Sequence, residues 1–104
     1  MPVDAIAVIA EPTRRRILDE LRRADSSVSA LVDKLAMSQP AVSKHLKVLR
    51  EAGFVSSRTA AQQRIYSLEP AQFRALDTWL APYRRLWNTH LDALERVLDS
   101  EENR

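Results

Sequence analysis

Cysteine is absent from this sequence, and glycine occurs only once in its 104 residues. Without cysteine the chain has no disulfides, thiolate metal ligands or cysteine nucleophile, and the absence fits a reducing compartment. Loops that cradle phosphates need several glycines, so the single glycine argues against a nucleotide-binding fold of that kind. No apolar run approaches the ~20 residues of a membrane span, and no signal peptide opens the chain. We therefore expect a cytoplasmic protein with no cofactor and no membrane partner.

The composition is that of a single helical domain. At 104 residues the chain has the length of one domain, so residues 1–104 are expected to share one modest core. Hydrophobic residues make up 45% and charged residues 29%, which is ordinary for a globular chain. The shortage of glycine, together with frequent Ala, Leu and Arg, predicts a mainly helical fold.

Positive charge is concentrated in the middle of the chain. Between residues 38 and 68 Glu51 is the only acid, and the bases are Lys44, Lys47, Arg50, Arg58 and Arg64. The segment after residue 68 carries more acids than bases. This distribution indicates an anionic partner for the middle of the chain, although charge runs often form solvated faces without a partner.

Hydrophobic spacing predicts three helices in the first third of the chain. A short helix covers residues 4–10, and Pro12 suits the first turn of a second helix that ends near Ala24. Ser29 is placed to cap a third, short helix. The apolar residues of that helix are Leu31, Val32 and Leu35.

A fourth helix follows, with one apolar and one polar face. Ser38 is a good N-cap with Pro40 in the first turn, and Gly53 is expected to end the helix in a left-handed C-cap. The inner face carries Val42, Leu46 and Leu49. The other side carries Ser43, Lys44, Lys47 and Arg50, with His45 toward the flank.

A β-hairpin and a long helical region complete the predicted order of four helices, two strands and a last helix. The segments FVSSR and RIYSL alternate apolar and polar residues, and TAAQQ separates them. Because no glycine stands in that turn, we expect a longer, looser loop. Pro82 lies inside the last helical region, which starts near Pro70, and predicts a kink or a break near Ala81.

This order predicts a winged helix-turn-helix, a mainly α fold with a small β wing, that binds double-stranded DNA. The turn falls at residues 36–38, so the fourth helix presents its polar side and its N-terminus to a duplex. The candidate DNA-binding residues of this helix are Ser38, Gln39, Pro40, Ser43, Lys44, His45 and Lys47. Those of the wing are Arg58, Gln62, Gln63 and Arg64.

Four segments resemble one protein family: EPTRRRILDEL, SQPAVSKHLKVLREAGFV, RIYSL and WLAPYRRLWNTHLDALERVL. From about Ile6 to Leu98 the chain looks like the ArsR-type winged helix-turn-helix transcriptional regulators. The second segment is quite specific, because it joins the recognition helix, its glycine cap and the first wing strand. The resemblance implies a homodimer that is built from the first and last helices, binds an inverted-repeat operator and usually represses it. A two-fold dimer would place its recognition helices ~34 Å apart, in successive major grooves.

The last helix also carries an argument for dimerisation from its own residues. Trp87, Leu91, Leu94 and Leu98 recur at intervals that are typical of a seam between two helices. The alternative is that this stripe covers the core of the monomer, and we expect it to be buried partly in the core and partly in the interface. We expect a dimerisation helix over about residues 70–99. The interface candidates are Ile6, Ile9, Trp79, Tyr83, Trp87, Leu91, Leu94 and Leu98.

Many members of this family sense metals, but this sequence lacks part of each set of metal ligands. One family site uses paired cysteines, which this chain lacks. A second site uses carboxylates and histidines of the last helix. Asp77 and His90 match two of its four positions, whereas Trp79 and Ala93 occupy the other two. Two ligands do not make a tetrahedral zinc site, so we expect no metal site. The alternative is a metal-responsive repressor with an atypical site.

Other residues and functions keep alternatives open. His45 either contacts a phosphate or supports the fold, and the arginines at 14–16 either clamp phosphates or brace the fold, at least one of them through a carboxylate. The chain could instead be a protein-interaction module that uses its apolar last helix, but the basic SQPAVSKHLK face argues against this. We do not expect an enzyme, because the sequence has only two histidines and shows no Ser/His/acid catalytic set. The sequence does not identify an effector.

Overall fold

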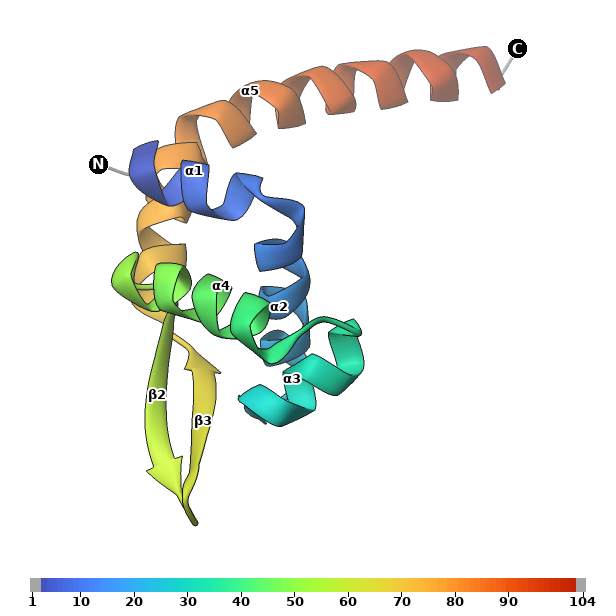
Figure 1. The fold of residues 1–104 in the computed structure, drawn as a ribbon. Coiled ribbons are helices and arrows are strands. Elements are labelled where there is room, and N and C mark those ends of the chain that lie inside the picture. Colours follow the sequence, from blue (N-terminus) through green and yellow to red (C-terminus); the bar gives the residue numbers. More distant parts are fainter. Residues whose placement is uncertain (1–2, 103–104) are drawn as a thin grey trace.

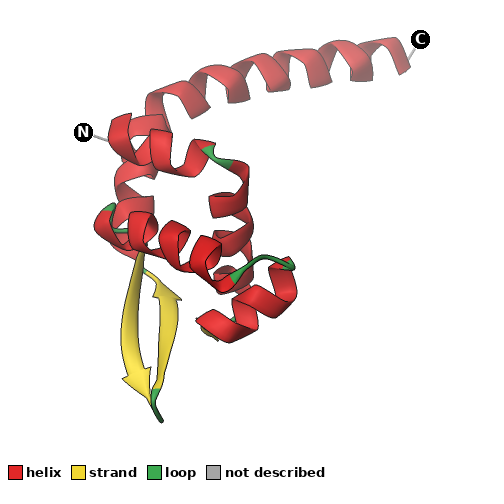
Figure 2. Ribbon diagram, viewed as in Figure 1, coloured by secondary structure: helices red, strands yellow, loops and turns green. Residues whose placement is uncertain are grey.

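The computed structural model describes residues 3–102, which form five helices and a small three-stranded sheet (Figure 1, Figure 2). In chain order the elements are α1 (Val3–Ala10), α2 (Pro12–Arg23), β1 (Ser26–Ser27), α3 (Val28–Leu35), α4 (Gln39–Glu51), β2 (Val55–Ala60), β3 (Gln63–Leu68) and α5 (Pro70–Glu102). The β2–β3 hairpin projects from one end of the helical body, and α5 extends away at the other end (Figure 1). The predicted winged helix-turn-helix is confirmed, with one strand added.

One core holds the helical body together. Its largest fully buried side chains are Phe54, Ile17, Leu31, Leu46, Leu49 and Val42. They come from α2, α3, α4 and the start of the wing, and the predicted inner face of α4 is confirmed. Burial of each such side chain contributes roughly 1.5–3 kcal/mol. Phe73 of α5 meets Phe54 edge-on, with ring centroids 5.1 Å apart, and so attaches the start of α5 to this core.

The short strand β1 is the element that the sequence analysis missed. Ser26 pairs with Tyr66 and Ser27 with Ile65, which gives an antiparallel sheet of order β1-β3-β2. Two residues are too few to show an alternating pattern. Helix α3 also begins earlier than predicted, directly after β1. The Ser27 hydroxyl accepts the N–H of Ala30, in the first turn, at 3.1 Å. The N-cap of α3 is therefore Ser27, and the expectation of Ser29 was wrong.

Both ends of α4 form as the sequence predicts. At its start the Ser38 hydroxyl accepts the Ala41 N–H at 3.3 Å. At its end Gly53 has a φ of +84°, and the Phe54 N–H donates to the Leu49 carbonyl at 3.0 Å. Glycine adopts this left-handed conformation without strain from a Cβ atom. The chain thereby turns directly from the recognition helix into the wing.

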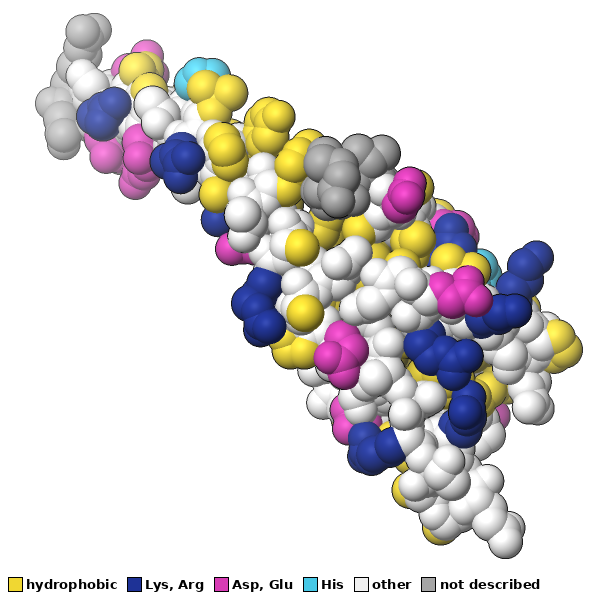
Figure 3. Space-filling model, turned by 90° about the vertical axis from the view of Figure 1, so that its left-hand side faces the viewer, with side chains coloured by type: hydrophobic (Ala, Val, Ile, Leu, Met, Phe, Trp, Pro, Cys, Tyr) yellow, Lys and Arg dark blue, Asp and Glu magenta, His cyan; other side chains and the backbone are white. Residues whose placement is uncertain are grey.

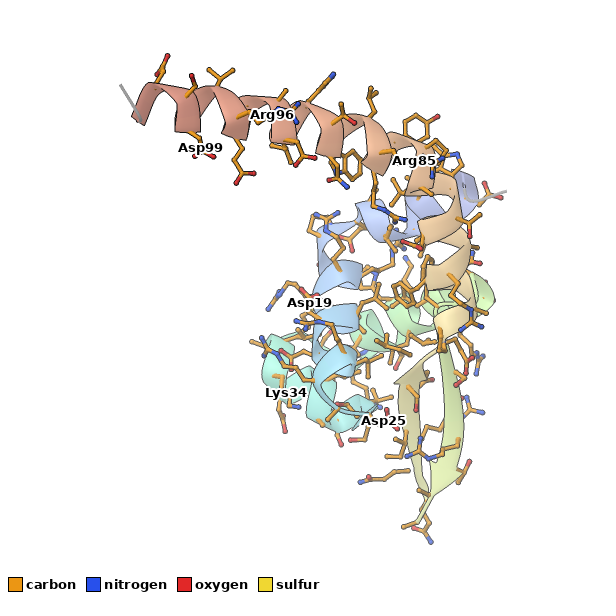
Figure 4. The ribbon with its side chains drawn as sticks, turned by 180° about the vertical axis from the view of Figure 1, so that it is seen from behind. Asp19, Asp25, Lys34, Arg85, Arg96 and Asp99 are labelled. Carbon is orange, nitrogen blue, oxygen red and sulfur yellow. The ribbon has the colours of Figure 1, made fainter. Side chains whose placement is uncertain are left out.

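The last helix is continuous through Pro82, so the predicted break was wrong and the predicted kink is confirmed. Figure 1 shows α5 changing direction, and Figure 4 places Arg85 at the bend. Pro82 has no N–H to donate, and its ring crowds the carbonyl of the preceding turn. Leu76 lies before the bend and is buried against the body, whereas the helix beyond the bend leaves the body. Within residues 3–102, no helix combines the length and the apolar character that crossing a membrane requires.

The turn of the wing is tighter than expected. Strands β2 and β3 pair as far as Ala60 and Gln63, which leaves Ala61 and Gln62 as a two-residue turn with φ of +48° and +70°. A turn with two positive φ angles matches the twist of the flanking strands, so the ladder continues to the tip. The expected loose loop was wrong because the ladder offsets the strain of two non-glycine residues, about 1–2 kcal/mol each.

Replacing this turn by better-suited residues should stabilise the protein. We expect the double variant Ala61→Asn/Gln62→Gly to gain about 1–2 kcal/mol, because asparagine and glycine tolerate the left-handed region. That gain corresponds to a Tm higher by roughly 4–8 °C for each kcal/mol, measurable by circular dichroism at a fixed protein concentration. Thr59→Gly, in β2, is the control and should lower the Tm. An unchanged Tm in the double variant would show that the turn is not strained.

Candidate nucleic-acid interface

A tight turn between α3 and α4 exposes the start of α4. Ala36 ends α3 in the left-handed conformation with a φ of +53°, and the Met37 N–H donates to the Val32 carbonyl at 3.4 Å. Leu35 and Val42, on either side of the turn, are both buried, so the two helices are held together by their inner faces. This arrangement is a helix-turn-helix with the N-terminus of its second helix at the surface.

The outer face of α4 is polar and open to solvent. The exposed predicted residues are Ser38, Gln39, Pro40, Ser43, Lys44 and Lys47. The first N–H groups of a helix lack acceptors within the helix and carry partial positive charge. Figure 3 shows Lys and Arg side chains gathered on one side of the body. The face therefore offers donors and positive charge to phosphates and base edges.

A hollow of about 320 Å³ lies between the start of α4 and the wing. Its lining is Ser27, Val28, Ser29, Gln39, Gln63 and Arg64. Hydroxyl, amide and guanidinium groups from α3, α4 and β3 thus share one surface, and the wing residues Gln62, Gln63 and Arg64 are exposed beside it. The place of Ser27 and Ser29 on this surface could not be recognised from the sequence, because their approach to the wing depends on the pairing of β1.

His45 differs from the other predicted residues of α4, because its ring is turned toward the fold. The ring is half-buried, and its buried Nδ1 lies 3.8 Å from Oε2 of Glu11, with no hydrogen-bond partner within residues 3–102. Glu11 caps α2 by accepting the Arg14 N–H at 3.0 Å. Burial raises the pKa of Glu11, but the N–H groups of Arg14 and Thr13 and the nearby imidazole outweigh this and lower it. This placement supports the structural alternative for His45.

The three consecutive arginines of α2 donate hydrogen bonds to main-chain carbonyls at the C-terminal ends of α1 and α3. The donor–acceptor pairs are Arg14 Nε to Val8 O at 2.7 Å, Arg15 Nη1 to Ile9 O and Ala10 O at 2.9 Å each, and Arg16 Nη2 to Leu35 O at 3.4 Å. A cation at a helix C-terminus is favoured because the terminal carbonyls are unpaired and partly negative. The arginines do brace the fold, but main-chain oxygens take the place of the expected carboxylate.

Arg58 lies on the side of the wing and is engaged there. Its Nη1 donates to Oδ2 of Asp25 at 3.0 Å and to Oγ of Ser67 at 2.9 Å. Hydrogen bonds from Ser67 and Arg58 hold the pKa of Asp25 below its usual value. Asp25 and Ser67 could not be recognised from the sequence, since nothing in their spacing shows that β1 brings residue 25 beside the wing.

One face of α5 beyond the bend is apolar and uncovered. Its exposed side chains include Tyr83, Leu86, Trp87, Leu91, Leu94, Val97 and Leu98, each between 44% and 59% exposed. Figure 3 shows hydrophobic side chains along one edge of this helix. Ile6 and Ile9 of α1 are only half-buried, and Trp79 is half-buried against Tyr83 with ring centroids 5.2 Å apart. The stripe from Trp87 to Leu98 therefore does not cover the core of its own chain.

The two residues that match the metal-sensing pattern are not grouped as ligands. Asp77 forms an ion pair with Arg84, and His90 is exposed. Across residues 3–102 no three His, Asp or Glu side chains come close enough together to hold a metal ion. Trp79 and Ala93, at the other two positions, carry no group that ligates zinc.

Comparison with known proteins agrees with this geometry. A sequence model described as "Bacterial regulatory protein, arsR family" matches residues 11–57, from the cap of α2 into β2. The HTH-type transcriptional regulator Rv2034 of Mycobacterium tuberculosis is 39% identical over 100 residues, which are 96% of this chain and 91% of that protein. The transcriptional repressor SdpR of Bacillus subtilis is 32% identical over 72 residues, 69% of this chain and 80% of that protein.

A solved structure extends the similarity to the fold. The ArsR-like transcriptional regulator from Rhodococcus sp. RHA1 superposes with a TM-score of 0.75 at 30% identity, over 95% of this chain and 91% of that one. The alignment covers nearly the whole length of both proteins. The chain therefore belongs to the arsR family of bacterial regulatory proteins and is a DNA-binding transcriptional regulator.

Proposed function

We propose that the protein is a homodimeric repressor that binds an inverted-repeat operator and whose DNA binding no metal controls. The observation that carries this proposal is the exposed, basic outer face of α4, held in place by a fully buried inner face. A similar protein, SdpR, is named a transcriptional repressor, which supports repression as the outcome. A pure protein-interaction module would have no use for this basic face.

In the proposed complex the start of α4 enters the major groove. Ser38, Gln39 and Pro40 bring the first turn to the DNA backbone, where its N–H groups meet phosphates. Ser43 and Lys44 lie one turn further along, within reach of base edges, and Lys47 reaches a phosphate. His45 supports the helix from behind through its contact with Glu11. On the wing Arg64, with Gln62 and Gln63, contacts the adjacent backbone.

The second copy is proposed to cover the apolar face of α5. Seven large hydrophobic side chains are exposed there, more than a lone helix in water would leave uncovered. The interface would be formed by the helix over about residues 70–99, together with the partly exposed Ile6 and Ile9 of α1. Two-fold symmetry then sets the two α4 helices ~34 Å apart, which fits an operator with two half-sites.

Metal independence is proposed from the side chains at the sensing positions. Asp77 is paired with Arg84, and an indole and a methyl group replace two of the four ligands. An atypical set of ligands is the alternative. Titration of the purified protein against its own upstream DNA, with EDTA and with added zinc, separates the two. We expect equal affinity in both conditions, and release of DNA by zinc would contradict the proposal.

Truncation of Lys44 should weaken operator binding. If Lys44 reads a guanine, Lys44→Ala costs about 1–3 kcal/mol and relaxes specificity at one base, and if it binds a phosphate the loss is uniform with a shallower salt slope. Fluorescence anisotropy at several salt concentrations measures both. Arg96→Ala, which removes the same charge from the far part of α5, is the control and should change affinity little. Equal affinities of the two variants would remove Lys44 from the interface.

A charge in the apolar face of α5 should separate the dimer. We expect Leu91→Arg to sediment as a monomer at micromolar concentration, because a buried guanidinium without a partner is strongly unfavourable. Thr89→Arg adds the same charge on the opposite side of the helix and should remain dimeric. A sedimentation coefficient that Leu91→Arg leaves unchanged would contradict this interface.

A further inference from the structure

A row of three polar side chains crosses the sheet where the wing leaves the body. Asp25 directly precedes β1, Ser67 lies in the central strand β3, and Arg58 lies in β2. Arg58 pairs in register with Ile65, so Ser67, two residues further along β3, is on the same face of the sheet. The guanidinium of Arg58 therefore reaches across the middle strand and contacts Ser67 at 2.9 Å and Asp25 at 3.0 Å.

The outer part of the hairpin, beyond its base, is open to solvent. Strand β1 pairs with β3 only at Tyr66 and Ile65, and the residues from Arg58 to Arg64 are exposed. The hairpin projects into solvent from that point (Figure 1). Figure 4 shows Asp25 beside the hairpin. The contact between Arg58 of β2 and Asp25, just before β1, thus joins the hairpin to the helix-turn-helix. It lies close to the point where the hairpin leaves the body.

We propose that Asp25 and Arg58 are positioning residues that fix the direction of the wing relative to α4, so that Arg64, close to the tip in β3, meets the DNA backbone. Arg58 acts through Asp25 and is not itself a ligand of DNA. This inference rests on the proposed function, since it assumes that the wing contacts DNA. It predicts that an acidic residue, Asp25, favours the binding of a polyanion.

That prediction has the opposite sign from simple electrostatics. Removing a negative charge near a basic surface should strengthen DNA binding, and it would also free Arg58 to bind a phosphate. Without the contact between Asp25 and Arg58, the wing must instead be ordered when DNA binds. The conformational entropy lost in this ordering weakens the affinity. The side chains of Arg58 and Asp25 are 58% and 47% exposed, so their pair adds little to global stability. Folding and positioning can therefore be measured separately.

The test compares Asp25→Asn with Asp33→Asn, which removes an exposed acid of α3 that makes no ion pair within residues 3–102. We expect Asp25→Asn to bind the operator about two- to fivefold more weakly than the parent, the size of an exposed ion pair. Asp33→Asn should bind as well as the parent or slightly better. Thermal melts should show both variants folded. If Asp25→Asn binds as tightly as the parent, or more tightly, the proposal is overturned.

Exchange of the two charges is a second test. We expect Arg58→Asp alone to bind weakly, and the double variant Asp25→Arg/Arg58→Asp to recover affinity because it restores the pair in reverse. If Arg58 were a phosphate ligand, the double variant would stay as weak as Arg58→Asp. That result would overturn the proposal.

A third measurement needs no DNA and so separates this inference from the proposed function. The chain has no cysteine, so Thr59→Cys provides a single site for a nitroxide on β2. We expect Asp25→Asn to make this label more mobile in its electron paramagnetic resonance spectrum, and Asp33→Asn to leave it unchanged. Equal mobility in all three proteins would overturn the proposal. A parent that binds no upstream DNA would refute the proposed function, and the spectra would still decide whether the pair orders the wing.

Discussion

The burial of one face of α4 fixes both the orientation of its polar face and the position of the wing. Val42, Leu46 and Leu49 are completely inaccessible to solvent, packed in one core with residues of α2, α3 and the start of β2. Because a helix has a single rotational setting once three such residues are buried, Ser43, Lys44 and Lys47 have to face outward. The same packing leads the chain through Gly53 into the wing, so the hairpin emerges beside the recognition helix.

Charged residues play different parts in the body and on its surface. Arg14, Arg15 and Arg16 are placed at the ends of α1 and α3, where they stabilise unpaired carbonyls. Lys44 and Lys47 are exposed and remain available to an anion. Positive charge in the sequence is therefore a poor guide to the DNA-binding surface until the acceptors of each guanidinium are known.

The two halves of α5 have different surroundings, and Pro82 separates them. Before the bend Leu76 is buried and Phe73 contacts Phe54, so this half belongs to the core. Beyond the bend Leu91 and Leu94 are more than half exposed. The bend directs this half away from the body, and its apolar face is thereby available to a second copy. Attachment to the core and the proposed dimerisation thus use successive parts of one helix.

The sequence by itself determined the helices, the two ends of α4 and its polar outer face, because periodicity, Ser38, Pro40 and Gly53 act over a few neighbouring residues. Only the tertiary structure decided which polar groups meet across long separations. The pairing of β1 with β3, the contact of Arg58 with Asp25 and the approach of His45 to Glu11 join residues far apart in the chain. The tight turn at Ala61 also depended on such context, because pairing along the whole hairpin overrides the local preference of two non-glycine residues.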